Sequence, residues 1–178
     1  MRTVTVSWDK SEGRFVALGT HHGREIQINA PSLDDPSRPP TGFSATELML
    51  ASAGACAAWD VVQILRKRRA QVARLEVAVE GHQQPDPPWT YERVALHFRV
   101  TSDQMSVPVM ARVIRLSIVR YCSVITTISG VSAIEATVEL VASDGTTTGR
   151  RPIELAIAAI PPPGFVEPTE DEPPATDP

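Results

Sequence analysis

Residues 44–68 read SATELMLASAGACAAWDVVQILRKR, and this stretch decides the fold. Ser44 followed three residues later by Glu47 is the pattern of a capping box, in which each side chain bonds the other residue's backbone amide. Residues 48–65 are apolar on nearly every side, which predicts a central buried helix that ends near Arg68. The alanine, serine and glycine residues in its middle allow a neighbouring backbone to pack closely.

Three short strands are expected before this helix. Residues 3–8 alternate between polar and apolar side chains, and residues 14–19 and 25–29 have a similar character. Together they predict an N-terminal hairpin or meander. Residues 31–42 contain four prolines, which remove backbone hydrogen-bond donors, so this segment is expected to be a loop.

Further strands and a second helix are expected after the first helix. Residues 72–80, 91–100 and 134–141 alternate as strands do. Between the last two, a helix is predicted from Ser106 to about Gly130, since proline at position 108 is tolerated in a first helical turn. Four of its residues fall at helical spacing on one buried stripe: Ile114, Ile118, Cys122 and Ile125.

The resulting order, β-β-β-α-β-β-α-β, predicts an α+β fold with mostly antiparallel strands. Paired strands separate the helices, which disfavours a doubly wound parallel sheet. We expect one domain over residues 1–143, followed by a C-terminal extension over residues 144–178. Within the extension, residues 151–160 fit one more strand or a short helix. Residues 161–178 include seven prolines and are expected to be largely disordered.

Charge and hydropathy exclude some classes of partner. The net charge is −4, but residues 167–178 carry five acidic residues and no basic ones. The rest of the chain has 16 acidic residues against 17 Lys and Arg, so no basic excess points to nucleic acid. The longest apolar stretch is interrupted by Asp60 and is too short to cross a membrane. No signal-peptide pattern opens the chain, so the expected location is the cytoplasm.

Two cysteines, Cys56 and Cys122, are the residues with the clearest chemical potential. In a reducing cytoplasm a structural disulfide is disfavoured. The thiols could be inert core residues, a redox pair or half of a metal site. A zinc site is the weakest of these, because the sequence has no closely spaced ligand pairs. We therefore expect neither a metal nor a cofactor.

Two motifs resemble the OsmC/Ohr family. Residues 46–62, TELMLASAGACAAWDVV, are similar to the first central helix of that family, and residues 121–124, YCSV, are similar to its second cysteine motif. Both are closest in form to the YhfA-like branch. The resemblance covers about residues 1–142 in element order. It implies a two-layer fold, with sheets around two long central helices, in an intertwined homodimer with its sites at the subunit interface.

The resemblance also implies a reaction. In active members the first cysteine attacks an organic hydroperoxide and becomes a sulfenic acid, and the second cysteine converts that acid to a disulfide. A dithiol then reduces the protein. Carried over, Cys56 is the peroxidatic thiol and Cys122 the resolving thiol.

Some positions depart from the family pattern. Active members hold the peroxidatic thiolate with an arginine and a glutamate, and the glutamate position is Thr46 here. Glu47 is nine residues before Cys56, about 180° away on a regular helix, which favours a capping role. Arg24 is the nearest arginine candidate and Arg14 the alternative. The usual proline after the second cysteine is replaced by a serine.

Asp60 is the remaining candidate site residue, because a carboxylate on an almost wholly apolar helix is unusual. Its role is either at the site or interface, or in a structural salt bridge. Three readings of the whole protein remain open. It is a thiol-dependent peroxidase, a protein of the same fold that binds a small apolar or electrophilic molecule, or a structural dimer with inert cysteines.

Overall fold

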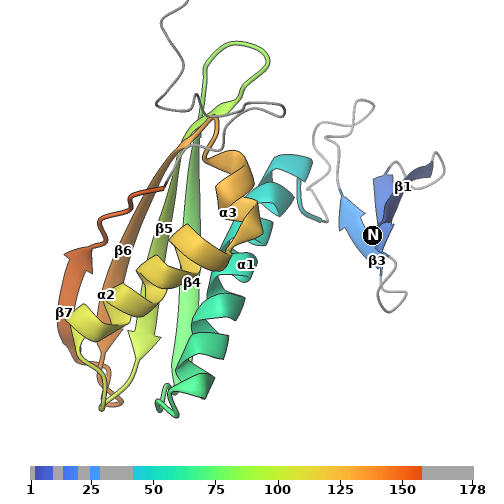
Figure 1. Cartoon of the computed structure of the whole chain (residues 1–178). Helices are drawn as coiled ribbons and strands as arrows, with labels where there is room; N and C mark the ends of the chain where they lie inside the picture. The colour runs from blue at the N-terminus through green and yellow to red at the C-terminus, as the bar shows by residue number, and fades with distance from the viewer. Residues whose placement is uncertain (1–2, 10–13, 20–24, 29–41, 158–178) are drawn as a thin grey trace, which may run out of the picture.

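The computed structural model describes residues 3–9, 14–19, 25–28 and 42–157, which form two separate sheets and a layer of helices (Figure 1). The element order expected from the sequence is confirmed, with one additional strand at the end. Most of the predicted loop at 31–42 lies outside the described residues.

The N-terminal sheet contains β1 (Val4–Asp9), β2 (Arg14–Gly19) and β3 (Glu25–Ile28), all antiparallel in the order β1-β2-β3. Alternation places Val4, Val6 and Trp8 on the same face of β1, and each is more than half exposed. The sheet stands beside the helices and packs little against them (Figure 1). Much of its apolar face is therefore uncovered within the described chain.

The first helix, α1 (Ala45–Lys67), begins as the sequence predicts. The Glu47 amide donates to Ser44 Oγ at 3.1 Å, and the Ser44 amide donates to Glu47 Oε2 at 2.7 Å, which completes the capping box. Although α1 is apolar nearly all round, only one face is buried, and Trp59 on another side is 66% exposed. The buried residues of α1 are Ala53, Gly54, Ala57, Val61 and Leu65.

By length and composition alone, α1 is long and apolar enough to cross a membrane, which corrects the expectation that this stretch is too short. A core helix of a globular domain meets the same criterion. Here the small-residue face of α1 packs on β4 (Arg74–Gln83) and on the second helical segment, as a core helix does.

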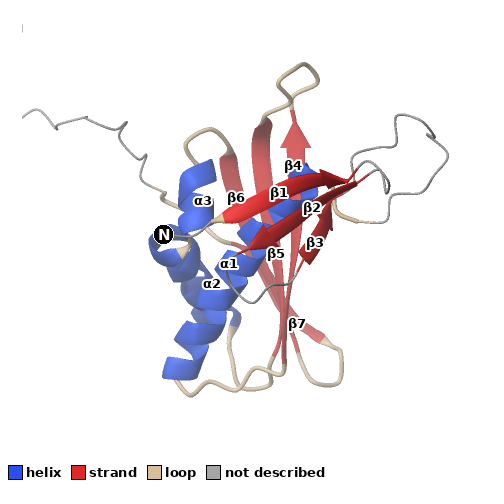
Figure 2. Cartoon of the chain, turned by 90° about the vertical axis from the view of Figure 1, so that its right-hand side faces the viewer, coloured by secondary structure: helices blue, strands red, loops and turns tan. Residues whose placement is uncertain are grey.

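The second sheet has the order β4-β5-β6-β7, with β5 at Tyr91–Thr101, β6 at Ala133–Val141 and β7 at Thr147–Pro152. The outer pairs are antiparallel, but β5 and β6 run parallel, with Leu96 opposite Ala136. A parallel neighbour requires the chain to cross back over the sheet, and the second helical segment makes that crossing. The helices lie on one face of this sheet, and the core lies between the two layers (Figure 2).

The second helical segment is not the single long helix that the sequence predicts. It consists of α2 (Val107–Leu116), a π-helical turn η1 (Ser117–Tyr121) and α3 (Ser123–Ile128). Cys122 separates the last two, with ψ at 96°, outside the helical region. The expected stripe is nevertheless confirmed as buried, with its four residues 0% exposed: Ile114, Ile118, Cys122 and Ile125.

The sheet continues past residue 143, where the sequence placed the end of the domain. The strand β7 pairs along β6, and it begins before the range 151–160 in which a further element was expected, overlapping that range at residues 151 and 152. Ile153 follows it and is 7% exposed within the core. Residues 158–178 lie outside the described chain.

Close packing of α1 on the sheet depends on Gly54. A Cβ at this position would come within 2.8 Å of Val79 Cγ2 on β4. We expect Gly54→Val to lower the free energy of unfolding by about 1–3 kcal/mol, since overpacking forces the helix from the sheet. Urea denaturation measures this.

Gly130→Val is the matched control, because a Cβ there has only Thr127 O within reach, at 3.8 Å. Adding Val79→Ala to Gly54→Val should restore part of the lost stability. Equal losses for the two glycine variants would show that the contact between helix and sheet is not tight.

Candidate functional site

The first thiol of the candidate site is positioned by α1. Cys56 is half-buried, and its neighbours Ala53 and Ala57, on the buried face, are wholly covered. Because the side chains on this face are small, the segment that packs across it approaches the backbone of α1 closely. Cys56 therefore stands at the edge of the core, within reach of both the core and the solvent.

The second thiol is positioned by the break in the second helical segment. In η1 the Cys122 amide donates to Ser117 O at 2.9 Å, which is the i→i+5 bond of a π-turn. The widened turn places Cys122 at the start of α3, with its side chain 0% exposed. Single π-turns of this kind occur frequently at functional sites.

A buried hydrogen bond ties the two segments together. Ser117 Oγ donates to Ala57 O at 2.8 Å, one residue after Cys56, and Ser117 is 0% exposed. Ser117 was not among the site residues predicted from the sequence. A signal was present, because a serine follows Ile114 at helical spacing on an otherwise apolar stripe, and a polar group there must find a buried partner.

The fold brings Cys56 and Cys122 together, and both are free thiols. The pKa of Cys122 is raised to about 12, chiefly by burial and next by its contact with the Cys56 side chain. The charge of Asp60 acts in the same direction, and the Ile125 amide opposes the shift. No cation among the described residues lowers the pKa of Cys122.

Asp60 belongs to the same group as the two thiols, since it lies on α1 one helical turn after Cys56. It is half-buried, and burial raises its pKa above the ordinary value. Within the described part of the chain, no side chain forms a hydrogen bond or ion pair with its carboxylate. The salt-bridge alternative therefore has no partner among these residues.

The other candidate residues lie away from the thiols or outside the described chain. The Glu47 carboxylate is bound by Ser44 at the start of α1, and these bonds lower its pKa. Arg14 lies on β2, in the N-terminal sheet. Arg24 lies outside the described residues. Of the five site residues that we expected, the structure thus groups Cys56, Cys122 and Asp60.

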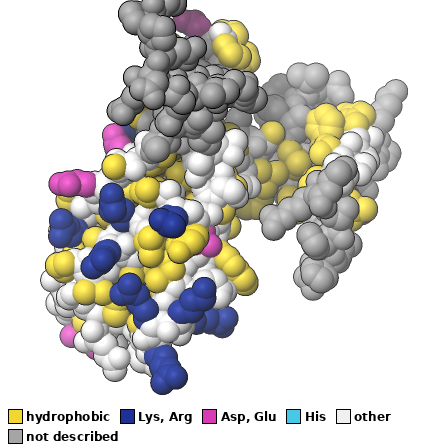
Figure 3. Space-filling model, in the orientation of Figure 1, with side chains coloured by type: hydrophobic (Ala, Val, Ile, Leu, Met, Phe, Trp, Pro, Cys, Tyr) yellow, Lys and Arg dark blue, Asp and Glu magenta, His cyan; other side chains and the backbone are white. Residues whose placement is uncertain are grey.

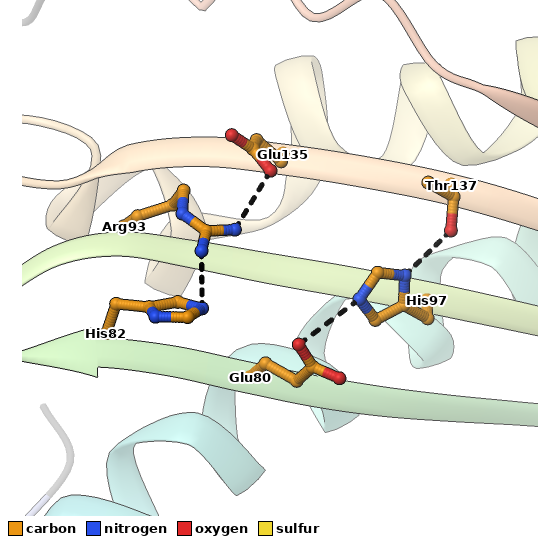
Figure 4. A network of polar contacts seen from close by, with 6 residues as sticks. All are labelled: Glu80, His82, Arg93, His97, Glu135 and Thr137. Carbon is orange, nitrogen blue, oxygen red and sulfur yellow. Dashed lines mark hydrogen bonds and ion pairs between the residues drawn. The ribbon is translucent and has the colours of Figure 1, made fainter.

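A second polar cluster lies on the face of the sheet opposite the helices (Figure 4). His97 bonds Thr137 Oγ1 at 2.8 Å and lies 3.8 Å from Glu80, and Arg93 bridges Glu135 and His82. These are cross-strand pairs on a solvated face, and they stabilise the sheet. The layer of strands separates them from the thiols.

Two surface hollows also lie away from the thiols. One, of about 360 Å³, is bordered by Arg74, Glu76 and Arg99, and the other, of about 200 Å³, lies between α2 and β7. Neither is lined by a cysteine. Among the described residues, no three His, Cys, Asp or Glu side chains gather as metal ligands do.

Comparison with known proteins identifies the family. Residues 37–139, more than half of the chain, match the family model of the OsmC-like proteins. Protein YhfA of Escherichia coli K12 is 38% identical over 81 residues, which are 46% of this chain and 60% of that protein. The match thus spans less than two thirds of this curated relative.

Solved structures show the same fold. An OsmC-like protein from Mycoplasma pneumoniae superposes with a TM-score of 0.67 at 19% identity, over 79% of this chain and 96% of that one. An organic hydroperoxide resistance protein from Elizabethkingia anophelis superposes with a TM-score of 0.60 at 12% identity, over 78% and 94% of the two chains. With the family model, these matches show that the chain belongs to the OsmC family.

Proposed function

We propose that this protein is a thiol-dependent peroxidase that reduces an organic hydroperoxide with Cys56 and Cys122. The observation that carries the proposal is the contact between these two thiols, which are far apart in sequence and meet where η1 crosses α1. Proteins of this fold include several named for organic hydroperoxide resistance. A reducing cytoplasm would supply the dithiol that returns both cysteines to the reduced state.

The proposed reaction has two steps. The Cys56 thiolate attacks the terminal oxygen of the hydroperoxide, the O–O bond breaks, and an alcohol and a Cys56 sulfenic acid form. Cys122 then attacks the Cys56 sulfur and displaces its oxygen as water, leaving a disulfide. The exposures of the thiols fit this order, since Cys56 is half-buried and Cys122 is wholly buried.

The first step requires a cation near Cys56, because a thiol is mostly protonated at neutral pH unless a positive charge stabilises the thiolate. Glu47 is engaged in the helix cap, so it does not hold such a cation in the family's manner. Arg24, or an arginine of a second copy of the chain, is the candidate. Without a cation near Cys56, the protein would bind an apolar or electrophilic molecule with little turnover.

We also propose that the protein is a homodimer in which a second copy covers the apolar surfaces left open here. The apolar face of the N-terminal sheet and much of α1 are exposed. Figure 3 shows hydrophobic side chains at the surface of the helix-bearing side, mixed with Lys and Arg. Apolar surface of this extent usually marks an interface.

The dimer can be tested on β1, where neighbouring residues face opposite sides of the sheet. We expect Val6→Lys, on the apolar face, to convert the dimer to monomer, because it places a charge in a dry interface. Thr5→Lys, on the other face, is the matched control and should leave the dimer intact. Sedimentation velocity measures both, and a wild-type monomer would rule the dimer out.

The peroxidase proposal is tested by mixing the reduced protein with cumene hydroperoxide. We expect both thiols to be lost at least about tenfold faster than free cysteine reacts, with a Cys56–Cys122 disulfide seen by thiol counting and intact mass. Cys56→Ser should abolish the reaction, since it removes the attacking sulfur.

Cys122→Ser serves as the second control. It should stop the reaction at the Cys56 sulfenic acid, which dimedone traps as a stable adduct. Thiols that stay reduced, or that react no faster than free cysteine, would reject the peroxidase and favour the binding reading.

A further inference from the structure

We propose that Asp60 is the proton acceptor for the Cys122 thiol when Cys122 attacks oxidised Cys56. Asp60 then passes this proton to the departing group. The inference rests on the proposed function in that it concerns the second step of the same thiol pair. It assigns a task to a carboxylate that the reaction described so far does not use.

The position of Asp60 is the first argument. It follows Cys56 by four residues on α1, so both side chains lie on the same side of the helix, one turn apart. Cys122 directly follows η1, and η1 packs on α1 where Ser117 bonds Ala57 O, between Cys56 and Asp60 in the sequence. The three groups therefore form one cluster, in which the carboxylate is the natural base.

The isolation of Asp60 is the second argument. Half-burying a carboxylate without a partner is costly, so such a group is rare in a structural role. The elements that pack on α1 are β4, α2, η1 and α3. Within the described chain, none of their charged or titratable side chains pairs with Asp60: Arg74, Glu76, Glu80, His82, Arg112, Arg115, Arg120 and Tyr121.

The chemistry of Cys122 is the third argument. Burial raises the pKa of Cys122 to about 12, so this thiol is protonated at pH 7. Only the thiolate attacks a sulfenic acid or a disulfide. A positioned base that removes the proton as the sulfur–sulfur bond forms allows the attack although little Cys122 thiolate is present.

The step balances without a further reactant. Cys122 loses its proton to the Asp60 carboxylate and forms a bond to the Cys56 sulfur, while the bond from Cys56 to its oxygen breaks. The departing hydroxide takes the proton from Asp60 and leaves as water. The two sulfurs end as a disulfide, and the carboxylate is ready to act again.

Asp60 could influence Cys122 in two ways, and they have opposite signs. If Asp60 acted only through its negative charge, removing the charge would lower the pKa of Cys122 and speed the attack. If Asp60 accepts the proton, removing it slows the attack. Asp60→Asn therefore separates the two roles by the direction of its effect.

The experiment follows disulfide formation in the full-length protein with 4,4′-dithiodipyridine, which needs no hydroperoxide. The first thiopyridone is released when the reagent couples to Cys56, and the second when Cys122 attacks that mixed disulfide. We expect Asp60→Asn to slow the second release at least about tenfold at pH 7 and to change the first less than about twofold. Asp60→Glu should recover part of the rate.

The pH profile provides a readout that a merely structural role would not change. In the wild type the second release should depend little on pH around neutrality, because the Asp60 side chain, and not a base from solution, takes the proton. In Asp60→Asn it should rise about tenfold per pH unit, as the free Cys122 thiolate becomes the only attacking species. Glu76→Gln, an exposed carboxylate on β4, is the matched control and should behave as wild type.

A second release in Asp60→Asn that is as fast as in wild type, or faster, would overturn the inference. The same cumene hydroperoxide assay then separates the two proposals. If the hydroperoxide leaves Cys56 reduced while Asp60→Asn still slows the second release, the proton acceptor stands and the peroxidase does not.

Discussion

The candidate site depends on the close approach of η1 to α1, which the small-residue face of α1 makes possible. Gly54 and Ala57 leave room for the sheet on one side and for the second helical segment on the other. The bond from Ser117 to the backbone of Ala57 fixes the crossing point, and a buried hydroxyl has no water to take its place. Since Cys56 precedes Ala57 directly, this crossing also brings the thiols together.

The π-turn places the second thiol, Cys122, beside this crossing. In a regular helix through residues 107–128, the Cys122 amide would bond Ile118 O, four residues earlier. The i→i+5 bond from Cys122 to Ser117 widens the turn, and the chain leaves the helix at Cys122 before α3 begins. The second thiol thus stands at a backbone break beside α1, although it remains wholly buried.

The sequence predicted the elements whose signals are local. The capping box at Ser44 and Glu47, the alternation of β4 to β6 and the buried stripe of the second helix all follow from short patterns. The π-turn was not predictable in this way, because residues 117–121 include no glycine or proline and suit an ordinary helix. The edge strand β7, TTGRRP, has no apolar alternation, since an edge strand with charges is held by backbone pairing.

Only part of the candidate site could be predicted from local sequence patterns. The cysteines were identifiable as chemical groups, and Asp60 was conspicuous as a charge on an apolar helix. The contact between the thiols depends on a tertiary crossing that no local pattern encodes. The role expected for Arg24 depended on matching family positions, whereas the capping role of Glu47 followed from the local sequence. The structure shows that the Glu47 carboxylate is engaged in the capping box, while Arg24 lies outside the described chain.

The unequal burial of the two thiols orders any reaction they undergo. A molecule from solution can reach the half-buried Cys56 but not Cys122, whose side chain is 0% exposed. Burial also holds the pKa of Cys122 at about 12, so this thiol stays protonated and inert until a reactive sulfur appears beside it. The same burial that makes Cys122 a poor nucleophile therefore protects it from oxidation by molecules in solution. The proposed attack by Cys122 therefore calls for a nearby proton acceptor, and Asp60, one helical turn from Cys56 on α1, is placed to be that acceptor.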